Sequence, residues 1–526
     1  MSESIATTFT NYRTMADMLR YQARRRAQHT AMIFAGRRTT YAELDARSNQ
    51  QAQALLSAGL DKQDRVAILA KNSDQFFELN FACWKTDTVL VPVNFRLAGP
   101  EIKVIVDDAL ARVLFVGREF YETIDSLQTD LPNVETIVAL DGGHPTWPSF
   151  DDWYSAQKAI DPHLDKDPDA TCMQLYSSGT TGLPKGVEIT HANILYLLPV
   201  AIEDWGRWHE DDVSMVAMPL FHIAGCEWAY LAFSLGATNV VMAEVDPGQI
   251  LNDIGEHGVT QTLFVPAVIL FLLQHPDCGQ TNFSSIKSIV YGASPIPLPL
   301  LQQAVETMDC DFAQVYGLTE TTGAVTYLSP EEHDGTEKMK SCGRVMRSAE
   351  IKIVNEDGET CATGVVGEIL IRSKQNMKGY WRRPEATSEA VNEDGWFHSG
   401  DAGYLDAEGY LYVHDRVKDM IISGGENIYP AEIESALAGH PALADVAIIG
   451  VPDDKWGEQV KAVVVLKPDA QLSYDELQTY ARERLAGFKV PRSMDVVDEL
   501  PRNPSGKILK RVLRAPYWEG RDRQVH

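Results

Sequence analysis

Short aliphatic runs alternate with stretches of helical periodicity from the N-terminus through residue 291. Residues 41–57 and 74–85 show the helical period, and Thr40 with Glu43 forms a capping box before the first of them. Seven short apolar runs are typical of strands, at residues 31–34, 65–69, 90–93, 136–140, 239–242, 262–265 and 288–291. Because parallel strands are joined by crossover helices, this alternation predicts α/β layers with largely parallel sheets.

The pattern changes between about residue 343 and residue 415. Short apolar runs there are separated by turns rich in Gly, Asp and Asn, which predicts a β-rich subdomain. Beyond Asp415, two strand patterns and two helix patterns predict a compact α+β domain, at residues 446–449, 462–466, 431–438 and 473–485. We therefore expect a large N-terminal domain over residues 1–415 and a small domain over 419–526.

The 526-residue chain is acidic, with 47 lysines and arginines against 74 aspartates and glutamates and a formal net charge of −27. A nucleic-acid-binding protein normally carries a basic footprint, so no nucleic acid partner is expected. Residues 481–526 differ, because they hold 11 basic and 6 acidic side chains. This excess suits either a solubilising tail or a lobe that attracts a small polyanion, and composition leaves both open.

Apolar runs and cysteines indicate the expected compartment. The longest strongly apolar run covers 12 residues, 262–273, and contains Pro266, whereas a membrane-spanning helix needs about 20 residues. No transmembrane segment is therefore expected, and the N-terminal residues lack the apolar segment of a secretory signal. The seven cysteines are scattered and never spaced as CxxC, which argues against disulfides and a zinc site and favours a reducing cytoplasm.

The densest motif is a loop rich in Ser, Thr and Gly that follows the strand-like run CMQLY. Its N–H groups and hydroxyls could converge on phosphate oxygens, and Gly allows close approach. The P-loop pattern is absent, because Gly182 is followed by Leu and Pro before the lysine. We predict phosphate binding, rather than an ordinary surface loop, by Ser177, Ser178, Gly179, Thr180, Thr181, Gly182 and Lys185.

Two further motifs offer side chains suited to a nucleotide. Residues 316–323 supply an aromatic face, hydroxyls and the carboxylate of Glu320, which suits a hard cation. Asp401 lies in a Gly-flanked turn, where a carboxylate could accept two ribose hydroxyl protons. Each motif taken alone also fits an ordinary strand-to-loop segment or a structural turn.

Two motifs near the C-terminus combine charged residues with glycine. A charged run from Asp415 precedes Gly424 and Gly425, which suits a pivot but also a solvated surface. Lys507 stands in a loop framed by Pro and Gly, where it presents one cation and also fits a solvated terminal lysine.

These motifs, in this order, resemble the adenylate-forming superfamily of acyl-CoA synthetases, firefly-type luciferases and peptide-synthetase adenylation domains. The resemblance runs from about Tyr41 to Leu513 and is closest to bacterial fatty-acid and aryl-acid CoA ligases. It implies an N-terminal AMP-binding domain, a hinge at residues 416–418 and a mobile C-terminal domain. It also implies ATP and CoA as co-substrates and Mg²⁺ as cofactor.

The resemblance assigns the nucleotide contacts. It implies that Tyr316 stacks on adenine, that Thr319 contacts the α-phosphate and that Glu320 holds Mg²⁺. The other wall of the adenine slot would be formed by Gly292, Ala293 and Ser294, and ribose would be contacted by Asp401 and Arg416.

The resemblance also assigns the residues for catalysis and domain movement. Lys507 would be the catalytic lysine, which neutralises charge as the carboxylate attacks the α-phosphorus and pyrophosphate leaves. Lys418 would be the hinge, and Gly424 and Gly425 would lie along the pantetheine tunnel. Candidates for contact with the CoA nucleotide are Trp456, Phe488 and Lys489.

The acid pocket is expected around the segment MPLFHIAG, in which His222 is either a gate of the acid site or a packed core residue. Gly317 stands where acetate-type relatives place a large aromatic residue, so acetate and propionate are not expected. Small or apolar residues dominate the predicted wall, which suits a medium or long alkyl chain or a bulky ring. The predicted lining is His222, Ile223, Cys226, Val265, Ala267, Ala293, Gly317 and Val325.

These expectations favour an acid–CoA ligase that forms an acyl-adenylate and then a thioester. A medium- or long-chain fatty acid is the favoured substrate, because fatty acids are the general substrate class of such ligases. The alternatives are a cinnamate-type or steroid side-chain acid, or transfer of the acyl group to a carrier protein. An oxygenase of the luciferase kind and a non-catalytic nucleotide-binding protein are further alternatives. The sequence leaves a homodimer open.

Overall fold

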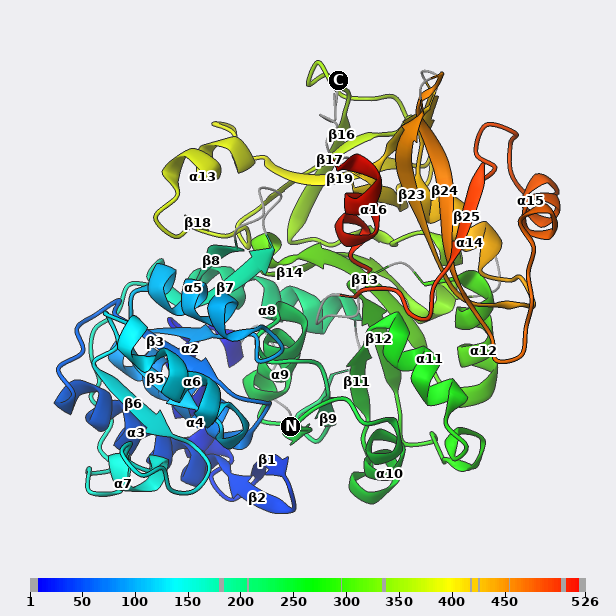
Figure 1. The fold of residues 1–526 in the computed structure, drawn as a ribbon. Helices are drawn as coiled ribbons and strands as arrows, with labels where there is room; N and C mark the ends of the chain where they lie inside the picture. The colour runs from blue at the N-terminus through cyan, green and yellow to red at the C-terminus, as the bar shows by residue number, and fades with distance from the viewer. Residues whose placement is uncertain are drawn as a thin grey trace.

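The structure is a computed structural model that describes residues 8–178, 184–205, 208–294, 296–333, 337–416, 419–423, 426–453, 455–502 and 508–519. It is mixed α/β, with two large sheets in the N-terminal part and two smaller sheets after them (Figure 1). The fold class predicted from the sequence is confirmed.

The first large sheet has nine strands, and its central strands are parallel while β2, β14 and β15 run antiparallel to their neighbours. Strands β11 and β12 are buried along their whole length, as expected for strands covered on both faces. In sheet order the strands are β15 (Arg344–Val345), β14 (Gly323–Leu328), β13 (Phe312–Leu318), β12 (Ser288–Gly292), β11 (Gln261–Phe264), β9 (Val213–Val216), β10 (Thr238–Val241), β1 (Thr30–Phe34) and β2 (Arg37–Thr40).

The second large sheet has seven strands, of which five are parallel and β8 and β18 are antiparallel. In sheet order they are β18 (Gly379–Tyr380), β8 (Pro184–Thr190), β7 (Thr171–Ser178), β4 (Val89–Pro92), β3 (Arg65–Leu69), β5 (Ala111–Val116) and β6 (Thr136–Ala139). The strand predicted at residues 65–69 is reproduced residue for residue, and the other early strands differ by one or two residues at their ends.

The predicted β-rich region forms a four-stranded antiparallel sheet of β16 (Ala349–Val354), β17 (Gly367–Ser373), β19 (Phe397–Leu405) and β20 (Leu411–Arg416). Two short strands of the same region join the large sheets instead, because β15 pairs with β14 and β18 pairs with β8. The β-rich region is therefore tied to both large sheets.

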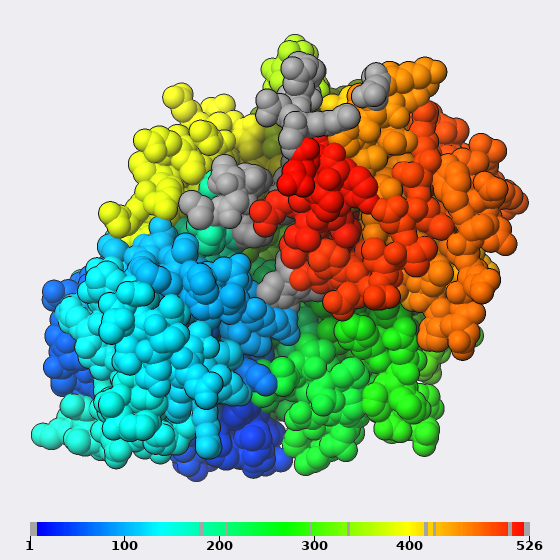
Figure 2. All heavy atoms as spheres, viewed as in Figure 1, coloured from blue at the N-terminus to red at the C-terminus, as the bar shows by residue number. Residues whose placement is uncertain are grey.

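The C-terminal residues form a sheet of their own from β21 (Ile421–Ser423), β22 (Glu426–Ile428), β23 (Leu443–Asp453), β24 (Gly457–Leu466) and β25 (Ser493–Val496). Three helices accompany it, α14 (Pro430–Leu437), α15 (Tyr474–Arg482) and α16 (Lys510–Trp518). In Figure 2 these orange and red residues occupy the upper right of the molecule, above the green residues of the nine-stranded sheet.

The remaining helices cover the large sheets. They are α2 (Met15–Arg25), α3 (Tyr41–Ser57), α4 (Asp74–Thr86), α5 (Gly99–Ala109), α6 (Tyr121–Leu127), α7 (Phe150–Ser155), α8 (His191–Trp205), α9 (Ile223–Leu235), α10 (Pro247–His257), α11 (Pro266–Gln274), α12 (Leu298–Met308) and α13 (Pro384–Ala390). The predicted capping box is present, because the Thr40 hydroxyl accepts from Glu43 N–H and the Glu43 carboxylate accepts from Thr40 N–H. Among helices in the described ranges, none is long and apolar enough to cross a bilayer.

Helices α8 and α9 lie between the two large sheets (Figure 1). Aromatic edge-to-face contacts join α9 to α4, with ring centroids 5.1 Å apart for Phe77 and Phe233 and 5.0 Å apart for Trp84 and Tyr230. All four rings are buried. The core is therefore continuous from one large sheet to the other through α9.

The ammonium group of Lys85 is fully buried where α4 packs on α3. Its Nζ lies 2.6 Å from Asp45 Oδ1 and donates to Asn49 Oδ1 at 2.6 Å and to Ser48 Oγ at 2.8 Å. A buried charge is tolerated when such partners satisfy it, and removing it leaves their oxygens without a donor. The network thus fixes the packing of the two helices.

We predict that Lys85→Met lowers the free energy of unfolding by about 3 kcal/mol, the usual cost of breaking a buried charged pair. Urea denaturation followed by tryptophan fluorescence measures it. The control is Lys340→Met, because Lys340 forms an ion pair with Glu337 three residues away and both side chains are exposed. That variant should change stability by ~0.5 kcal/mol or less. Equal small losses in both variants would contradict the assigned network.

Candidate active site

Glu320 lies between β13 and β14, in the short 3-10 helix η4 (Thr319–Thr321). Its Oε1 accepts hydrogen bonds from the hydroxyls of Ser177 and Tyr380, both at 3.1 Å. Ser177 belongs to β7 and Tyr380 to β18, so three segments that are distant in sequence meet at this carboxylate. Within the described ranges Oε2 has no hydrogen-bond donor, which leaves a carboxylate oxygen for a hard cation such as Mg²⁺.

The backbone around Glu320 is held by residues that follow β17. The side-chain amide of Gln375 is buried and donates to the carbonyls of Thr321 at 2.8 Å and Ala324 at 2.9 Å. The N–H of Met377 donates to the Glu320 carbonyl at 2.7 Å. The β-rich region therefore fixes the turn that carries the carboxylate.

Tyr316 and Asp401 are in direct contact. The Tyr316 hydroxyl donates to Asp401 Oδ2 at 2.7 Å, which joins β13 to β19. Asp401 is buried, and its N–H donates to Ser399 Oγ at 3.0 Å. In the β19–β20 ladder Asp401 lies opposite Arg416. The residues that the resemblance assigns to adenine and ribose are thus brought together.

Residues 292–294 follow β12 and lie next to β13. Gly292 is paired with Val315, whose carbonyl a Cβ at position 292 would overlap. Ala293 has a φ of +66°, a left-handed conformation that costs strain in a residue with a side chain. This close approach places Gly292, Ala293 and Ser294 beside the strand that carries Tyr316.

Lys185 lies at the start of β8, opposite Ser177 in the β7–β8 ladder. Its Nζ is 4.9 Å from the centroid of the Tyr380 ring, a distance suited to a cation–π contact. In the part of the chain that the structure describes, no carboxylate forms an ion pair with Lys185. Its charge therefore stands beside Glu320 and the end of β7, where the phosphate loop begins.

Several predicted site residues lie outside the described residues, namely Gly179, Thr180, Thr181, Gly182, Lys418, Gly424, Gly425 and Lys507. For Ser178 and Arg416 the backbone is described, at the ends of β7 and β20, but the side chains are not. Their roles stay predictions.

A cavity of about 60 Å³ adjoins these motifs. The turn that follows Tyr316 supplies Gly317, Gly323 and Ala324 to its wall, and the segment after β12 supplies Gly292 and Ala293. Of the predicted acid-pocket residues, the wall includes His222, Ile223, Ala293 and Gly317, whereas it does not include Cys226, Val265, Ala267 and Val325.

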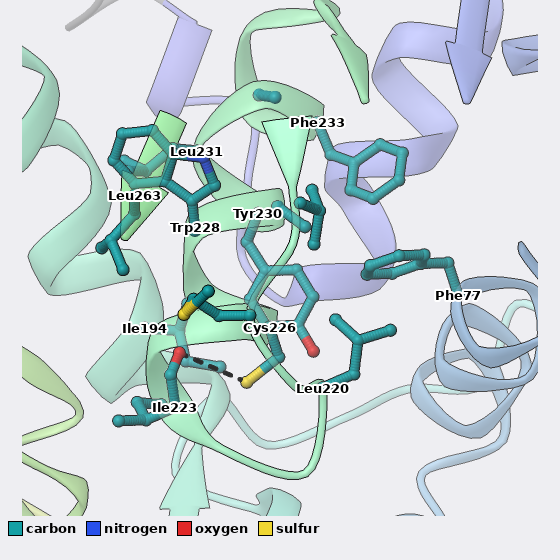
Figure 3. Close-up of a cluster of buried hydrophobic side chains, with 14 of the residues drawn as sticks. Phe77, Ile194, Leu220, Ile223, Cys226, Trp228, Tyr230, Leu231, Phe233 and Leu263 are labelled. Carbon is teal, nitrogen blue, oxygen red and sulfur yellow. Dashed lines mark hydrogen bonds between the residues drawn. The ribbon is translucent and has the colours of Figure 1, made fainter. Parts of the chain in front are cut away.

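Helix α9 separates the cavity from the core. Its cavity-lining residues recur with the helical period, at Ile223, Ala224, Glu227, Trp228 and Leu231. Figure 3 shows Trp228 and Leu231 on the side of Leu263, while Tyr230 and Phe233 point toward Phe77 on the other side. Cys226 belongs to the core side, where its thiol contacts the carbonyl of Ile223 at 3.6 Å (Figure 3).

Gly317 is required by the approach of two strands. A Cβ at this position would overlap the carbonyl of Gly323, because the register of the β13–β14 ladder shifts between Tyr316 and Gly317. The sequence interpretation was that a glycine here leaves space in the pocket. Gly317 does line the cavity, but the space next to its Cα is filled by the backbone of the following turn.

Two polar side chains stand in the mostly apolar wall. His222 caps α9, and its Nδ1 accepts from the Ala224 N–H at 3.3 Å, so a neutral imidazole carries its proton on Nε2. Burial lowers the pKa of His222 to about 4, which keeps the ring neutral near pH 7. Burial also raises the pKa of the Glu227 carboxyl well above its usual range.

Sequence reasoning missed Glu227, Tyr380 and Gln375. Glu227 stands four residues after Ile223, a predicted pocket residue, so helical spacing was the signal available for it. Tyr380 and Gln375 come from a region predicted only as β-rich, and nothing in the local sequence indicates that it returns to Glu320.

The three candidates for the CoA nucleotide lie in the C-terminal part. Phe488 is 38% exposed. Lys489 forms an ion pair with both carboxylate oxygens of Glu432, at 2.6 and 2.7 Å. The ring of Trp456 lies 4.8 Å from the Arg492 guanidinium. A contact of these side chains with CoA stays a prediction.

Comparison with known proteins identifies the family of the chain. A family model described as AMP-binding enzyme matches residues 19–381, and one described as AMP-binding enzyme C-terminal domain matches residues 432–507. The chain belongs to the AMP-binding enzyme family. That family is made up of acyl-CoA synthetases and related AMP-forming ligases, and the chain is therefore an AMP-forming acid–thiol ligase.

Relatives cover nearly the whole chain. The fatty acid–acyl-carrier-protein ligase ScoC of Streptomyces coeruleorubidus is 40% identical, over 98% of each chain. A feruloyl-CoA synthase from an Amycolatopsis species is 38% identical, over 94% of this chain and 97% of its own. The anthranilate CoA ligase AuaEII, solved with anthranoyl-AMP, superposes with a TM-score of 0.89 at 28% identity, covering 96% of this chain and 98% of its own.

We predict that Tyr380→Phe raises the Mg²⁺ concentration needed for half-maximal adenylation at least about tenfold, because Glu320 loses one of the two hydroxyls that orient it. Titration of Mg²⁺ in an assay of AMP formation measures this. Tyr196→Phe serves as the control, because the structure shows no hydrogen bond from that hydroxyl to any described residue. An unchanged Mg²⁺ requirement in Tyr380→Phe would contradict the assignment.

Proposed function

We propose that this enzyme activates a compact carboxylic acid as its adenylate and then transfers the acyl group to a thiol. The observation that carries the proposal is that one segment contributes both to the candidate nucleotide site and to the wall of the cavity. Residues 316–324 hold Tyr316 against Asp401 and Glu320 against Ser177, and the same segment lines the cavity at Gly317, Gly323 and Ala324.

The first step needs no enzyme nucleophile. A carboxylate oxygen of the acid attacks the α-phosphorus of ATP, and the bond to the bridging oxygen breaks to release pyrophosphate. We assign Tyr316 to the adenine, Asp401 and Arg416 to the ribose, and Thr319, Ser177 and Lys185 to the phosphates. Lys507 would neutralise the charge that develops during this attack.

In the second step a thiol sulfur attacks the acyl carbonyl carbon. The bond to the carboxylate oxygen that bridges to phosphorus breaks, AMP leaves, and the thiol proton passes to solvent. A single small domain could serve both steps if Lys507 withdraws before the thiol enters. We therefore retain Lys418 as the hinge and Gly424 and Gly425 as the path of the thiol.

Glu320 fits a divalent cation, since one carboxylate oxygen is held by two hydroxyls and the other accepts from no described donor. Mg²⁺ bound there would neutralise phosphate charge. The residues of the chain set its position, because Ser177 and Tyr380 orient the carboxylate and Gln375 holds the turn.

The cavity supports a compact acyl group. Its volume of about 60 Å³ is well below the roughly 300 Å³ at which pockets for drug-sized ligands begin, and Glu227 adds a polar group to its wall. The medium- or long-chain fatty acid favoured by sequence stays the alternative substrate, supported by relatives named as fatty-acid ligases, and would need a longer apolar space. Relatives named for ferulate and anthranilate make a compact aromatic acid a reasonable candidate.

A carrier-protein thiol is the second candidate acceptor beside free CoA. It is favoured by the relative named as a fatty acid–acyl-carrier-protein ligase, which matches 98% of the chain. Both acceptors present the same phosphopantetheine thiol, so the first half-reaction is common to them.

Product analysis by mass spectrometry tests the proposal. The purified protein receives Mg-ATP and one acid at a time, from C4 to C18 fatty acids, cinnamates, aminobenzoates and steroid acids, each without thiol, with CoA and with a phosphopantetheinylated carrier. We expect acyl-AMP with compact acids and a thioester with one of the two thiols. Lys507→Ala is the control and should form no acyl-AMP. Acyl phosphate with ADP as products would contradict the proposal.

A further inference from the structure

Among the residues that the structure describes, the carboxyl group of Glu227 has no partner. Glu227 lines the cavity, and no residue in the described ranges forms a hydrogen bond or ion pair with its side chain. The residue is neither fully buried nor exposed, so part of its surface faces the cavity. A carboxyl that faces a cavity without a protein partner is available to hydrogen-bond a ligand bound there.

The turn beside the nucleotide motif leaves room for this carboxyl. Gly323 has a φ of +112°, and a Cβ at that position would overlap Glu227 Oε2. The conformation of the turn is fixed from the other side, because Thr321 Oγ1 donates to the Gly323 carbonyl and Gln375 holds the Thr321 carbonyl. The backbone thus accommodates the Glu227 side chain at the point where the cavity meets the turn.

The surroundings disfavour the ionised form of the carboxyl. Ionised groups are costly to bury without a partner, and burial accordingly raises the pKa of Glu227. A protonated carboxyl both donates and accepts hydrogen bonds. Two other wall residues, Trp205 and Trp228, have indole N–H groups for which no described residue supplies an acceptor.

We propose that Glu227 determines specificity by binding a hydroxyl group on the acyl part of the acid. This inference rests on the proposed ligase function. A hydroxyl both donates and accepts hydrogen bonds, so it can pair with the Glu227 carboxyl without bringing a further charge into the cavity. Because the cavity is small, the substrate class that the proposal names is a compact hydroxy acid.

The test compares pairs of acids that differ only in the hydroxyl: 4-hydroxycinnamate with cinnamate, 4-hydroxybenzoate with benzoate, and 3-hydroxybutyrate with butyrate. Acid-dependent ATP–pyrophosphate exchange gives kcat/KM for each acid. We expect the wild type to prefer the hydroxylated member of at least one pair about tenfold or more, because the unsubstituted acid leaves Glu227 unsatisfied.

Two variants separate recognition from packing. In Glu227→Leu the preference for the hydroxylated acid should disappear or reverse, because kcat/KM rises for the unsubstituted acid. Glu227→Gln keeps both a donor and an acceptor, so it should keep most of the preference. Leu231→Met is the matched control, because it changes an apolar wall residue on the same helix face and should affect both members of a pair alike.

The possible results are distinguishable. The role of Glu227 is overturned if the wild type and Glu227→Leu show the same preference for the hydroxylated acid in every pair that is adenylated. That result leaves the ligase function intact. A wild type that adenylates no acid of any kind, including the wider panel used for product analysis, contradicts the ligase function and this inference with it.

Discussion

The turn between β13 and β14 is the constraint on which the rest of the site depends. Glu320 in this turn accepts hydroxyl hydrogen bonds from β7 and from β18, and its backbone is held by residues that follow β17. The turn therefore ties the nine-stranded sheet, the seven-stranded sheet and the β-rich region together at one carboxylate. A cation bound to Glu320 would be positioned by all three.

Helix α9 carries the second constraint, because its two faces serve different purposes. One face packs Tyr230 and Phe233 into the core that joins the large sheets. The other face lines the cavity and contains Glu227, the polar residue that the core could not accommodate. Since the helix packs against the core behind it, the part of the cavity wall that α9 supplies is pre-organised. The rest of the wall comes from the turn after Tyr316 and the segment after β12.

Some strands and helices of the large sheets were predicted from sequence because their physical signals are local. Strand β3 is an uninterrupted apolar run that is buried on both faces, and α3 begins at a capping box. The nucleotide motifs were recognised through their order along the chain, which resembles a known superfamily. Tyr380 and Gln375 were not, because their positions depend on β18 pairing with β8 across a long stretch of chain. Cys226 was expected in the pocket and lies in the core, since α9 is apolar on both faces and its orientation could not be read from the pattern.

The central claim is that the carboxylate of the acid attacks the α-phosphorus of ATP. Its most direct test uses an acid that carries ¹⁸O in both carboxylate oxygens, with Mg-ATP, a thiol and mass spectrometry of the products. The account predicts that one ¹⁸O atom appears in AMP, because the carbon–oxygen bond breaks when the thiol attacks the acyl-adenylate. Label in pyrophosphate or inorganic phosphate, with none in AMP, would contradict it.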